Sequence, residues 1–307
     1  MENKVCLAYL FSGCLTDKSL TDVLRKIDFK KLTYLSVAFV LFEEQDGVWM
    51  PILDAETAAE IPLLKAEIER QQANTKILLS VGGAGMDGFC QVSRTAESRE
   101  TFAKEIRRMA DAHGVDGIDI DWEFPGSGML GITHCKHCKK DYILLLEALR
   151  RHLRERLLTV AVGGHLYLGV DKKMLGRLVD YVFVMTYDLG VYHSSAPKAK
   201  SSVSAWHLAG IPKEKLCIGV PFYGKNVKNL AETVGYTDAR TGEISHTFGQ
   251  SFSWYQGKKW CLDMPSDAKS KARWVYGNGF GGVFCWEITT DFDNQMLGAM
   301  CDGIEGK

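Results

Sequence analysis

Four carboxylates lie within one short and otherwise apolar segment of this chain, residues 116–123, with the sequence DGIDIDWE. Side chains alternate between the two faces of an extended strand, so Asp119, Asp121 and Glu123 share one face. Like charges that are buried together raise one another's pKa and can hold a proton on one carboxyl group. A general acid at neutral pH requires a carboxyl group that stays protonated. The spacing therefore predicts a catalytic site, with Glu123, the last member, as the acid.

A solvated acidic edge strand is the alternative interpretation of this segment. It is disfavoured because Ile118, Ile120 and Trp122 make the opposite face of the strand apolar from residue 118 onward. Proline and glycine at 125–126 then end the strand abruptly. Asp116 has the opposite parity from the other three carboxylates, and we expect it to be structural rather than catalytic.

The segment matches the Asp-x-x-Asp-x-Asp-x-Glu signature of glycoside hydrolase family 18, the chitinases and their relatives. Four further segments resemble motifs of that family in the same order along the chain. They are SVGG at 80–83, MTYD at 185–188, GVPFYG at 219–224 and GGVFCWE at 281–287. The resemblance extends from about Val5 to Asp291.

The resemblance implies a retaining glycosidase that works by substrate assistance, an exception to the usual pair of catalytic carboxylates. Glu123 would protonate the leaving oxygen while the substrate's own 2-acetamido carbonyl attacks the anomeric carbon. Glu123 would then act as a base toward water on the oxazolinium intermediate. Asp121 would orient the acetamido group and share a proton with Asp119, and Tyr187 would donate its hydroxyl to the acetamido oxygen.

The same resemblance implies a set of substrate-binding side chains. Trp286 would form the floor of the subsite for the reacting sugar, because a flat apolar ring suits the C–H face of a pyranose. Asp188 would bind a sugar hydroxyl or the acetamido group of the next sugar. Less distinct matches, for which simple core packing stays an alternative, are Tyr9, Phe39, Met185 and Tyr223.

Short apolar runs alternate with amphipathic stretches along the chain, which is the pattern of repeated βα units. The expected strands are 5–10, 34–41, 76–81, 115–123, 157–162, 181–187, 216–220 and 282–286, and the clearest helices are 55–72, 96–113, 140–153 and one that opens at 263–266. Eight units predict a (β/α)₈ TIM barrel with its active site at the carboxyl ends of the strands. No linker interrupts the pattern, so residues 1–307 are expected to form a single catalytic domain.

Two features set this chain apart from many family members. Only residues 225–259 are available for an insertion between the seventh and eighth strands, which we expect to be short or vestigial. Ala84 follows the SVGG segment where many members have a tryptophan that stacks on the leaving-group sugar. Both features favour a shallower groove, and soluble chitooligosaccharides or other N-acetylglucosamine glycans over long crystalline chitin.

Cys135 and Cys138, with His134 beside them, form the one local cluster that resembles a metal site. A structural zinc site usually needs about four ligands, and no second Cys-x-x-Cys follows. We therefore expect no metal, although a disulfide between the two stays open. Ser80 is not in a Gly-x-Ser-x-Gly elbow, and Gly82 and Gly83 lack the spacing of a phosphate loop, so no cofactor is expected.

Composition limits the partners. The net charge of −1, from 37 basic and 38 acidic residues, argues against nucleic acid as a partner or a polybasic membrane contact, and we expect a monomer. Nine cysteines, an odd number with several inside predicted strands, favour a reducing, cytoplasmic setting. A secreted chain lacking its signal peptide would look the same.

The leading hypothesis is thus an endo-chitinase-type hydrolase of β-1,4-linked N-acetylglucosamine glycans. Two alternatives remain open. One is an endo-β-N-acetylglucosaminidase that acts on N-glycan or cell-wall glycan, and the other is a non-catalytic chitin-binding lectin. The retained carboxylates and Tyr187 weigh against the lectin.

Overall fold

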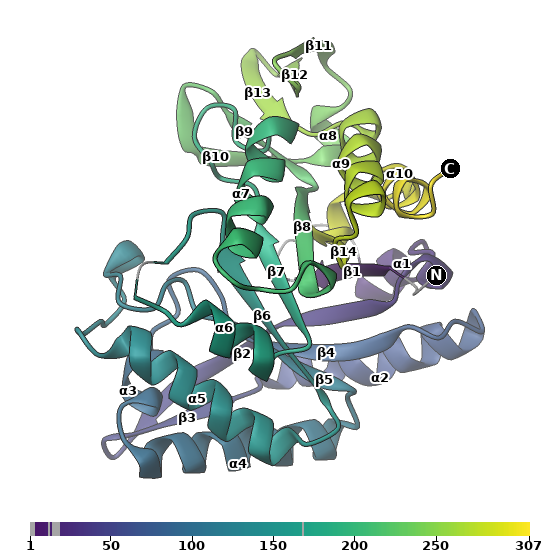
Figure 1. Ribbon diagram of the computed structural model, residues 1–307. Coiled ribbons are helices and arrows are strands. Elements are labelled where there is room, and N and C mark those ends of the chain that lie inside the picture. The colour runs from purple at the N-terminus through teal and green to yellow at the C-terminus, as the bar shows by residue number, and fades with distance from the viewer. Residues whose placement is uncertain (1–3, 12, 14–18, 168) are drawn as a thin grey trace.

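The computed structural model describes residues 4–11, 13, 19–167 and 169–307. Eight parallel strands close into a barrel, and Figure 1 shows how the elements are arranged. The sheet order is β1-β14-β8-β7-β6-β5-β4-β2, and β1 also pairs with β2, which closes the ring. The barrel strands are β1 (Val5–Leu10), β2 (Tyr34–Gln45), β4 (Lys76–Gly82), β5 (Gly117–Asp121), β6 (Leu157–Gly163), β7 (Tyr181–Met185), β8 (Leu216–Pro221) and β14 (Gly282–Trp286). The predicted (β/α)₈ barrel is confirmed.

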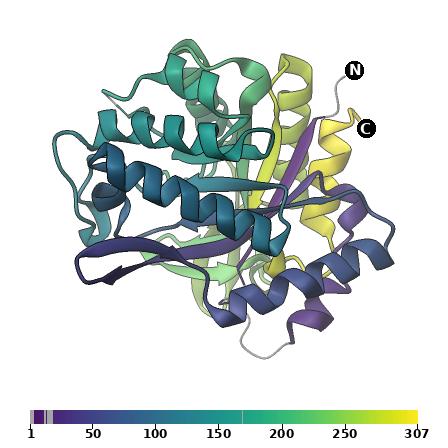
Figure 2. The same cartoon turned by 90° about the horizontal axis from the view of Figure 1, so that it is seen from below.

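Helices surround the barrel on its outer side, as the view from below shows (Figure 2). They are α1 (Leu20–Leu24), α2 (Ala55–Arg70), α3 (Phe89–Ser93), α4 (Ala96–His113), α5 (Cys138–Leu153), α6 (Lys172–Leu178), α7 (Ala196–Leu208), α9 (Pro265–Asn278) and α10 (Gln295–Ile304). Helix α4 begins and ends where the sequence predicts. Thr95 and Ser98 form a capping box at its start, and Gly114 adopts the left-handed conformation that ends it. None of the described helices is long and apolar enough to cross a membrane.

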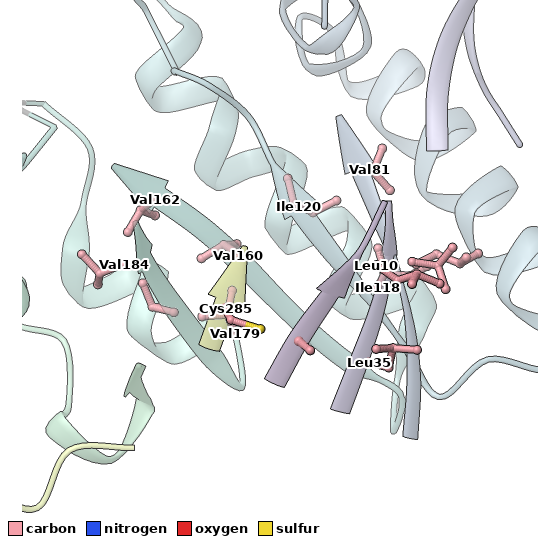
Figure 3. Packing of buried hydrophobic residues seen from close by; sticks show 14 of the residues in the cluster. Leu10, Leu35, Val81, Ile118, Ile120, Val160, Val162, Val179, Val184 and Cys285 are labelled. Atoms are coloured by element: carbon pink, nitrogen blue, oxygen red, sulfur yellow. The ribbon is translucent and has the colours of Figure 1, made fainter. Parts of the chain in front are cut away.

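The core has two apolar layers. Side chains on the outer faces of the strands pack against the helices, among them Ile118 and Ile120 of β5 and Val160 and Val162 of β6 (Figure 3). A separate, largely aromatic cluster that includes Phe183 and Phe284 fills the barrel interior. Burial of these faces is the main force that holds the strands in place.

Two predicted strands end earlier than expected. Strand β5 ends at Asp121 and β7 at Met185, so Glu123 and Tyr187 lie just beyond the last paired residues. The ladder between β5 and β6 stops at Ile120. Both side chains therefore belong to the segments that leave the barrel toward its carboxyl-terminal mouth.

The insertion after β8 is short, as predicted, but it is not vestigial. It forms a complete five-stranded antiparallel sheet in the order β10-β9-β13-β12-β11, which extends from one end of the molecule (Figure 1). Its elements are β9 (Tyr223–Asn226), β10 (Asn229–Gly235), α8 (Tyr236–Ala239), β11 (Glu243–Thr247), β12 (Gln250–Tyr255) and β13 (Lys258–Leu262). Tight turns let five very short strands fit into this stretch, which is why its length alone was misleading.

Strand β2 also runs four residues past its predicted end at Leu41, to Gln45. It pairs in antiparallel fashion with β3 (Val48–Ile52). The turn between them contains Asp46 and Gly47, both with positive φ, as expected of a tight hairpin.

Candidate active site

A cleft of about 1120 Å³ opens at the carboxyl ends of the barrel strands. The predicted residues that line it are Tyr9, Phe39, Asp121, Glu123, Met185, Tyr187, Asp188, Tyr223 and Trp286. Asp119 lies beneath the cleft and is fully buried. The structure thus gathers side chains from distant parts of the sequence around one cavity, at the place where barrel enzymes bind their substrates.

Asp119 accepts hydrogen bonds from hydroxyl groups on three other strands, the adjacent β4 and β6 and the more distant β1. Tyr9 of β1 donates to Oδ2 at 2.7 Å, and Ser80 of β4 donates to the same oxygen at 2.9 Å. Thr159 of β6 donates to Oδ1 at 2.6 Å. Burial raises the pKa of Asp119, but the hydroxyl donors act in the opposite direction. This cage can stabilise a carboxylate inside the barrel.

Asp121 has a different environment two residues later. Its side chain is buried, and Oδ1 has no hydrogen-bond partner within the described part of the chain. Burial raises its pKa well above the ordinary value, and the charges of Glu123 and Asp119 raise it further. Asp121 therefore retains a proton more readily than Asp119 does. Proton sharing between the two stays a prediction.

Glu123 lies partly exposed at the cleft surface. Burial first, and the negative charge of Asp188 second, raise the pKa of Glu123 from its ordinary 4.5 to about 7. A substantial fraction of the carboxyl groups is then protonated at neutral pH. This is the property that a general acid needs.

Asp188 is held as an anion by a small polar clamp. Tyr223 donates its hydroxyl to Oδ1 at 2.7 Å, and the Lys225 ammonium lies 2.9 Å from the same oxygen. Partial desolvation by itself would raise the pKa of this half-exposed carboxyl, but the hydrogen bonds with His193, Tyr223 and Lys225 outweigh it and lower the pKa to about 2. Lys225 and His193 were not predicted to take part, because only folding brings them to Asp188.

Trp286 stands among aromatic rings. Phe39 stacks near it with centroids 5.6 Å apart, and Phe11 does so at 6.0 Å. The ring of Tyr9 is tilted at 5.5 Å. Phe11, which also lines the cleft, was missed from the sequence. Its position one residue beyond β1 was the available signal, since residues just past barrel strands face the mouth.

Tyr187 and Asp116, two further residues of the sequence analysis, differ in their surroundings. Tyr187 is 8% exposed, and burial followed by the nearby carboxyl charges raises its pKa well above 10, so its hydroxyl stays a donor. Asp116 accepts a hydrogen bond at 2.9 Å from the backbone N–H of Ile77. That contact joins the residue just before β5 to the start of β4, in agreement with a structural role for Asp116.

Glycine is required where β4 meets the acidic strand. A Cβ at Gly82, which has φ +109°, would lie 2.4 Å from the carbonyl oxygen of Asp121. The next residue, Gly83, donates its backbone N–H to that same oxygen at 2.9 Å. The SVGG segment therefore positions the acidic strand by close backbone contact.

One cluster near the cleft contains ligands that suit a metal. Cys135 and Cys138 are joined in space by Cys90 of α3, and the three sulfur atoms lie within 4.8 Å of one another. The sequence did not indicate Cys90, which is 45 residues away from Cys135 in the chain and lies in no motif. Cys14 lies outside the described residues.

The sequence matches a known protein family and several curated proteins. A family model described as "Glycosyl hydrolases family 18" matches residues 12–291. Chitinase A1 of Niallia circulans is 31% identical over 297 residues, which cover 75% of this chain and 42% of that protein. The chain spans about half the length of the curated relatives that it matches, with 63%, 42% and 58% for three of them.

Solved structures have the same fold. A class V chitinase mutant from Nicotiana tobaccum in complex with NAG4 superposes with a TM-score of 0.82 at 20% identity, over 98% of this chain and 99% of that one. A chitinase-like agglutinin from Robinia pseudoacacia has a TM-score of 0.82 at 20% identity, over 97% and 98% of the two chains. At this identity the likeness concerns the fold alone.

Proposed function

The chain belongs to glycosyl hydrolase family 18, and from this premise we propose that it is a retaining glycoside hydrolase of the endo-chitinase type. Its substrates would be glycans with β-1,4-linked N-acetylglucosamine. The observation that carries the proposal is the distribution of protons among the carboxyl groups that line or underlie the cleft. One of them, Glu123, has a pKa of about 7 and reaches the cavity.

The remaining carboxyl groups are poor nucleophiles, each for its own reason. Asp119 is caged by hydroxyl donors and lies beneath the cleft. The pKa of Asp121 is raised strongly by burial and then by its neighbours' charges, which favours a protonated, unreactive group. Asp188 is neutralised by Lys225. A double displacement through an enzyme carboxylate would therefore lack a free nucleophile, which favours attack by the substrate's own acetamido oxygen.

The proposed reaction then follows from the positions of the side chains. Glu123 donates its proton to the glycosidic oxygen as the bond to the anomeric carbon breaks. The acetamido carbonyl oxygen bonds to that carbon, and Tyr187 donates its hydroxyl to the acetamido group. Asp121 passes its proton toward Asp119 and, now negatively charged, stabilises the positive charge on the nitrogen. Glu123, now ionised, takes a proton from water, which attacks the anomeric carbon from the same face as the departed sugar and restores the acetamido group.

The aromatic group around Trp286 would bind the sugar whose bond is cleaved. Its rings offer a broad apolar surface, and Asp188, Tyr223 and Lys225 supply polar groups on the cleft wall. Ala84, which also lines the cleft, provides no aromatic platform. Short soluble chitooligosaccharides are therefore the preferred substrates in this proposal.

Incubation with chitotetraose and chitohexaose, with products resolved by size and by anomer, tests the proposal. Chitobiose with the β-anomer formed initially at its new reducing end is the expected result, and Glu123→Gln should release it far more slowly. Initial α-anomer would contradict the retaining mechanism.

Two other results would replace the proposed function with another. Tight binding of both oligomers without cleavage would favour a lectin, as the fold shared with the Robinia pseudoacacia agglutinin permits. Cleavage of an N-glycan or a cell-wall glycan, but of neither oligomer, would favour an endo-β-N-acetylglucosaminidase.

A further inference from the structure

Three thiols converge beside the cleft from two separate segments. Cys90 lies on α3, which follows β4, while Cys135 and Cys138 lie where the segment after β5 enters α5. The Sγ atoms of Cys135 and Cys138 are 3.4 Å apart, and those of Cys138 and Cys90 are 3.2 Å apart. All three cysteines are free.

These separations fit one tetrahedral metal ion. With Zn–S bonds of about 2.3 Å, two thiolates on the same zinc lie about 3.8 Å apart. The two separations given above are a few tenths of an ångström shorter, and all three sulfur atoms lie within 4.8 Å of one another. Small side-chain rotations therefore suffice to place the sulfur atoms around a common centre.

Two local features stabilise a thiolate at Cys138, against the burial that raises the pKa of Cys138 and of Cys90. The backbone N–H of Cys135 donates to the Cys138 sulfur at 3.2 Å. Cys138 is the first residue of α5, a helix of 16 residues, and the positive end of the helix dipole stabilises a negative sulfur there. Thiolates select soft or borderline ions, of which zinc prefers tetrahedral coordination.

We infer that Cys90, Cys135 and Cys138 form a structural site for a thiophilic divalent ion, with Zn²⁺ as the best fit. Binding releases the thiol protons to solvent. The fourth position is taken by water or by the imidazole of His134 or His137, the exposed side chains that directly precede the two cysteines.

An ion bound here would hold one rim of the cleft in place. The segment between β5 and Cys135 includes Pro125, Met129 and Leu130, which line the cavity. Thr133 in the same segment already bonds to Asp87, just before α3, through its backbone N–H at 3.2 Å and its hydroxyl at 2.5 Å. The ion would add a second and stronger link between the same two segments.

Metal titration of the purified, reduced and chelator-treated protein without oxygen tests the inference. Co²⁺ should bind with a stoichiometry of one and give the intense thiolate-to-cobalt absorption of a tetrahedral site, and Zn²⁺ should displace it. Zn²⁺ should also raise the melting temperature, because it binds the native state only.

Variants identify the ligands. Replacing a residue that only supports a metal ligand typically lowers metal affinity by roughly 10–100-fold. Cys90→Ser and Cys135→Ser each remove a ligand itself, so each should lower Zn²⁺ affinity by more than that; Cys135 is the more exposed of the two. Cys301→Ser is the matched control. Its sulfur lies 3.4 Å from that of Cys6, but the pair belongs to no group of three ligands in the described part of the chain, so the cobalt spectrum should not change.

Three results would overturn the inference. The first is reduced protein that takes up no Co²⁺ or Zn²⁺. The second is a thiolate–cobalt spectrum that persists in both Cys90→Ser and Cys135→Ser. The third is a disulfide between Cys135 and Cys138 that forms in air even with zinc present in excess, which would indicate a redox-active cysteine pair. None of these readouts depends on the proposed hydrolase activity.

Discussion

Replacing Asp188 with asparagine should move the alkaline limb of the pH–rate profile toward lower pH. Catalysis requires protonated Glu123, so kcat/KM falls as the pH rises through the Glu123 pKa of about 7. The negative charge of Asp188 contributes to this raised pKa of Glu123. Without the charge, Glu123 ionises at lower pH and activity is lost earlier as the pH rises.

The size of the shift follows from the causes of the raised pKa. The Glu123 pKa rises from 4.5 to about 7, with burial as the larger cause and Asp188 as the smaller. The Asp188 side chain is 49% exposed and pairs with Lys225, so solvent and the lysine both weaken its effect. We therefore expect a downward shift of roughly half a pH unit to one unit, equivalent to about 0.7–1.4 kcal/mol.

Lys225→Met tests the direction of the shift, because it should move the alkaline limb of the pH–rate profile the opposite way. Removing the cation leaves the Asp188 charge uncompensated, so the alkaline limb should move upward instead. The assay is kcat/KM on chitohexaose from about pH 4 to about pH 9, which reports the pKa of the free enzyme. Asp46→Asn, at the exposed hairpin between β2 and β3, is the control that should leave the limb in place. Two results would refute this electrostatic account. One is an alkaline limb that does not move in Asp188→Asn, and the other is a shift of the same sign in Asp188→Asn and Lys225→Met.

Other substitutions test separate parts of the structure. Asp121→Asn should lower kcat by about 100-fold or more and alter the pH profile, because it changes the coupled carboxyl groups; an unchanged profile would count against their coupling. Trp286→Ala should weaken chitohexaose binding roughly tenfold, about 1.4 kcal/mol, through loss of a stacking surface, and calorimetry that finds equal affinity would remove it from the subsite. Lys271 is fully buried in an ion pair with Asp263 at the base of the insertion. Lys271→Met should lower the free energy of unfolding, measured in urea, by about 3–5 kcal/mol because it leaves a buried carboxylate without its cation. Adding Asp263→Leu should restore much of that loss. A loss below about 1 kcal/mol in Lys271→Met would mean that the ion pair is not buried in solution.

The fold was predictable because each βα unit contains its own local signals. Strand β1 and helix α4 have the predicted bounds, since the apolar run of the first is self-contained and the second has Thr95 before it and Gly114 after it. The five-stranded sheet of the insertion was not foreseen. Its strands are four to seven residues long, and their stability comes from pairing with one another, which local patterns do not reveal.

The acidic segment was predictable for a similar reason, because strand periodicity alone puts Asp119, Asp121 and Glu123 on one face. The partners of those carboxyl groups were harder to predict. The contact of Tyr9 with Asp119 spans 110 residues, and that of Lys225 with Asp188 links β9 to the segment after β7. Cys90 joined the other two thiols only through the packing of α3. Such contacts depend on tertiary structure and leave no local pattern. The expectations of a monomer and of a cytoplasmic or secreted location stay predictions.

Glu123→Gln tests the central claim most directly. Calorimetry with chitohexaose and turnover on the same oligomer would be measured side by side for the wild-type protein and the variant. The amide keeps the shape of the side chain but has no acidic proton to donate, so binding should persist while kcat falls by about 10²–10⁴-fold. Near-normal turnover in Glu123→Gln would contradict its role as the general acid, and with it the proposed mechanism.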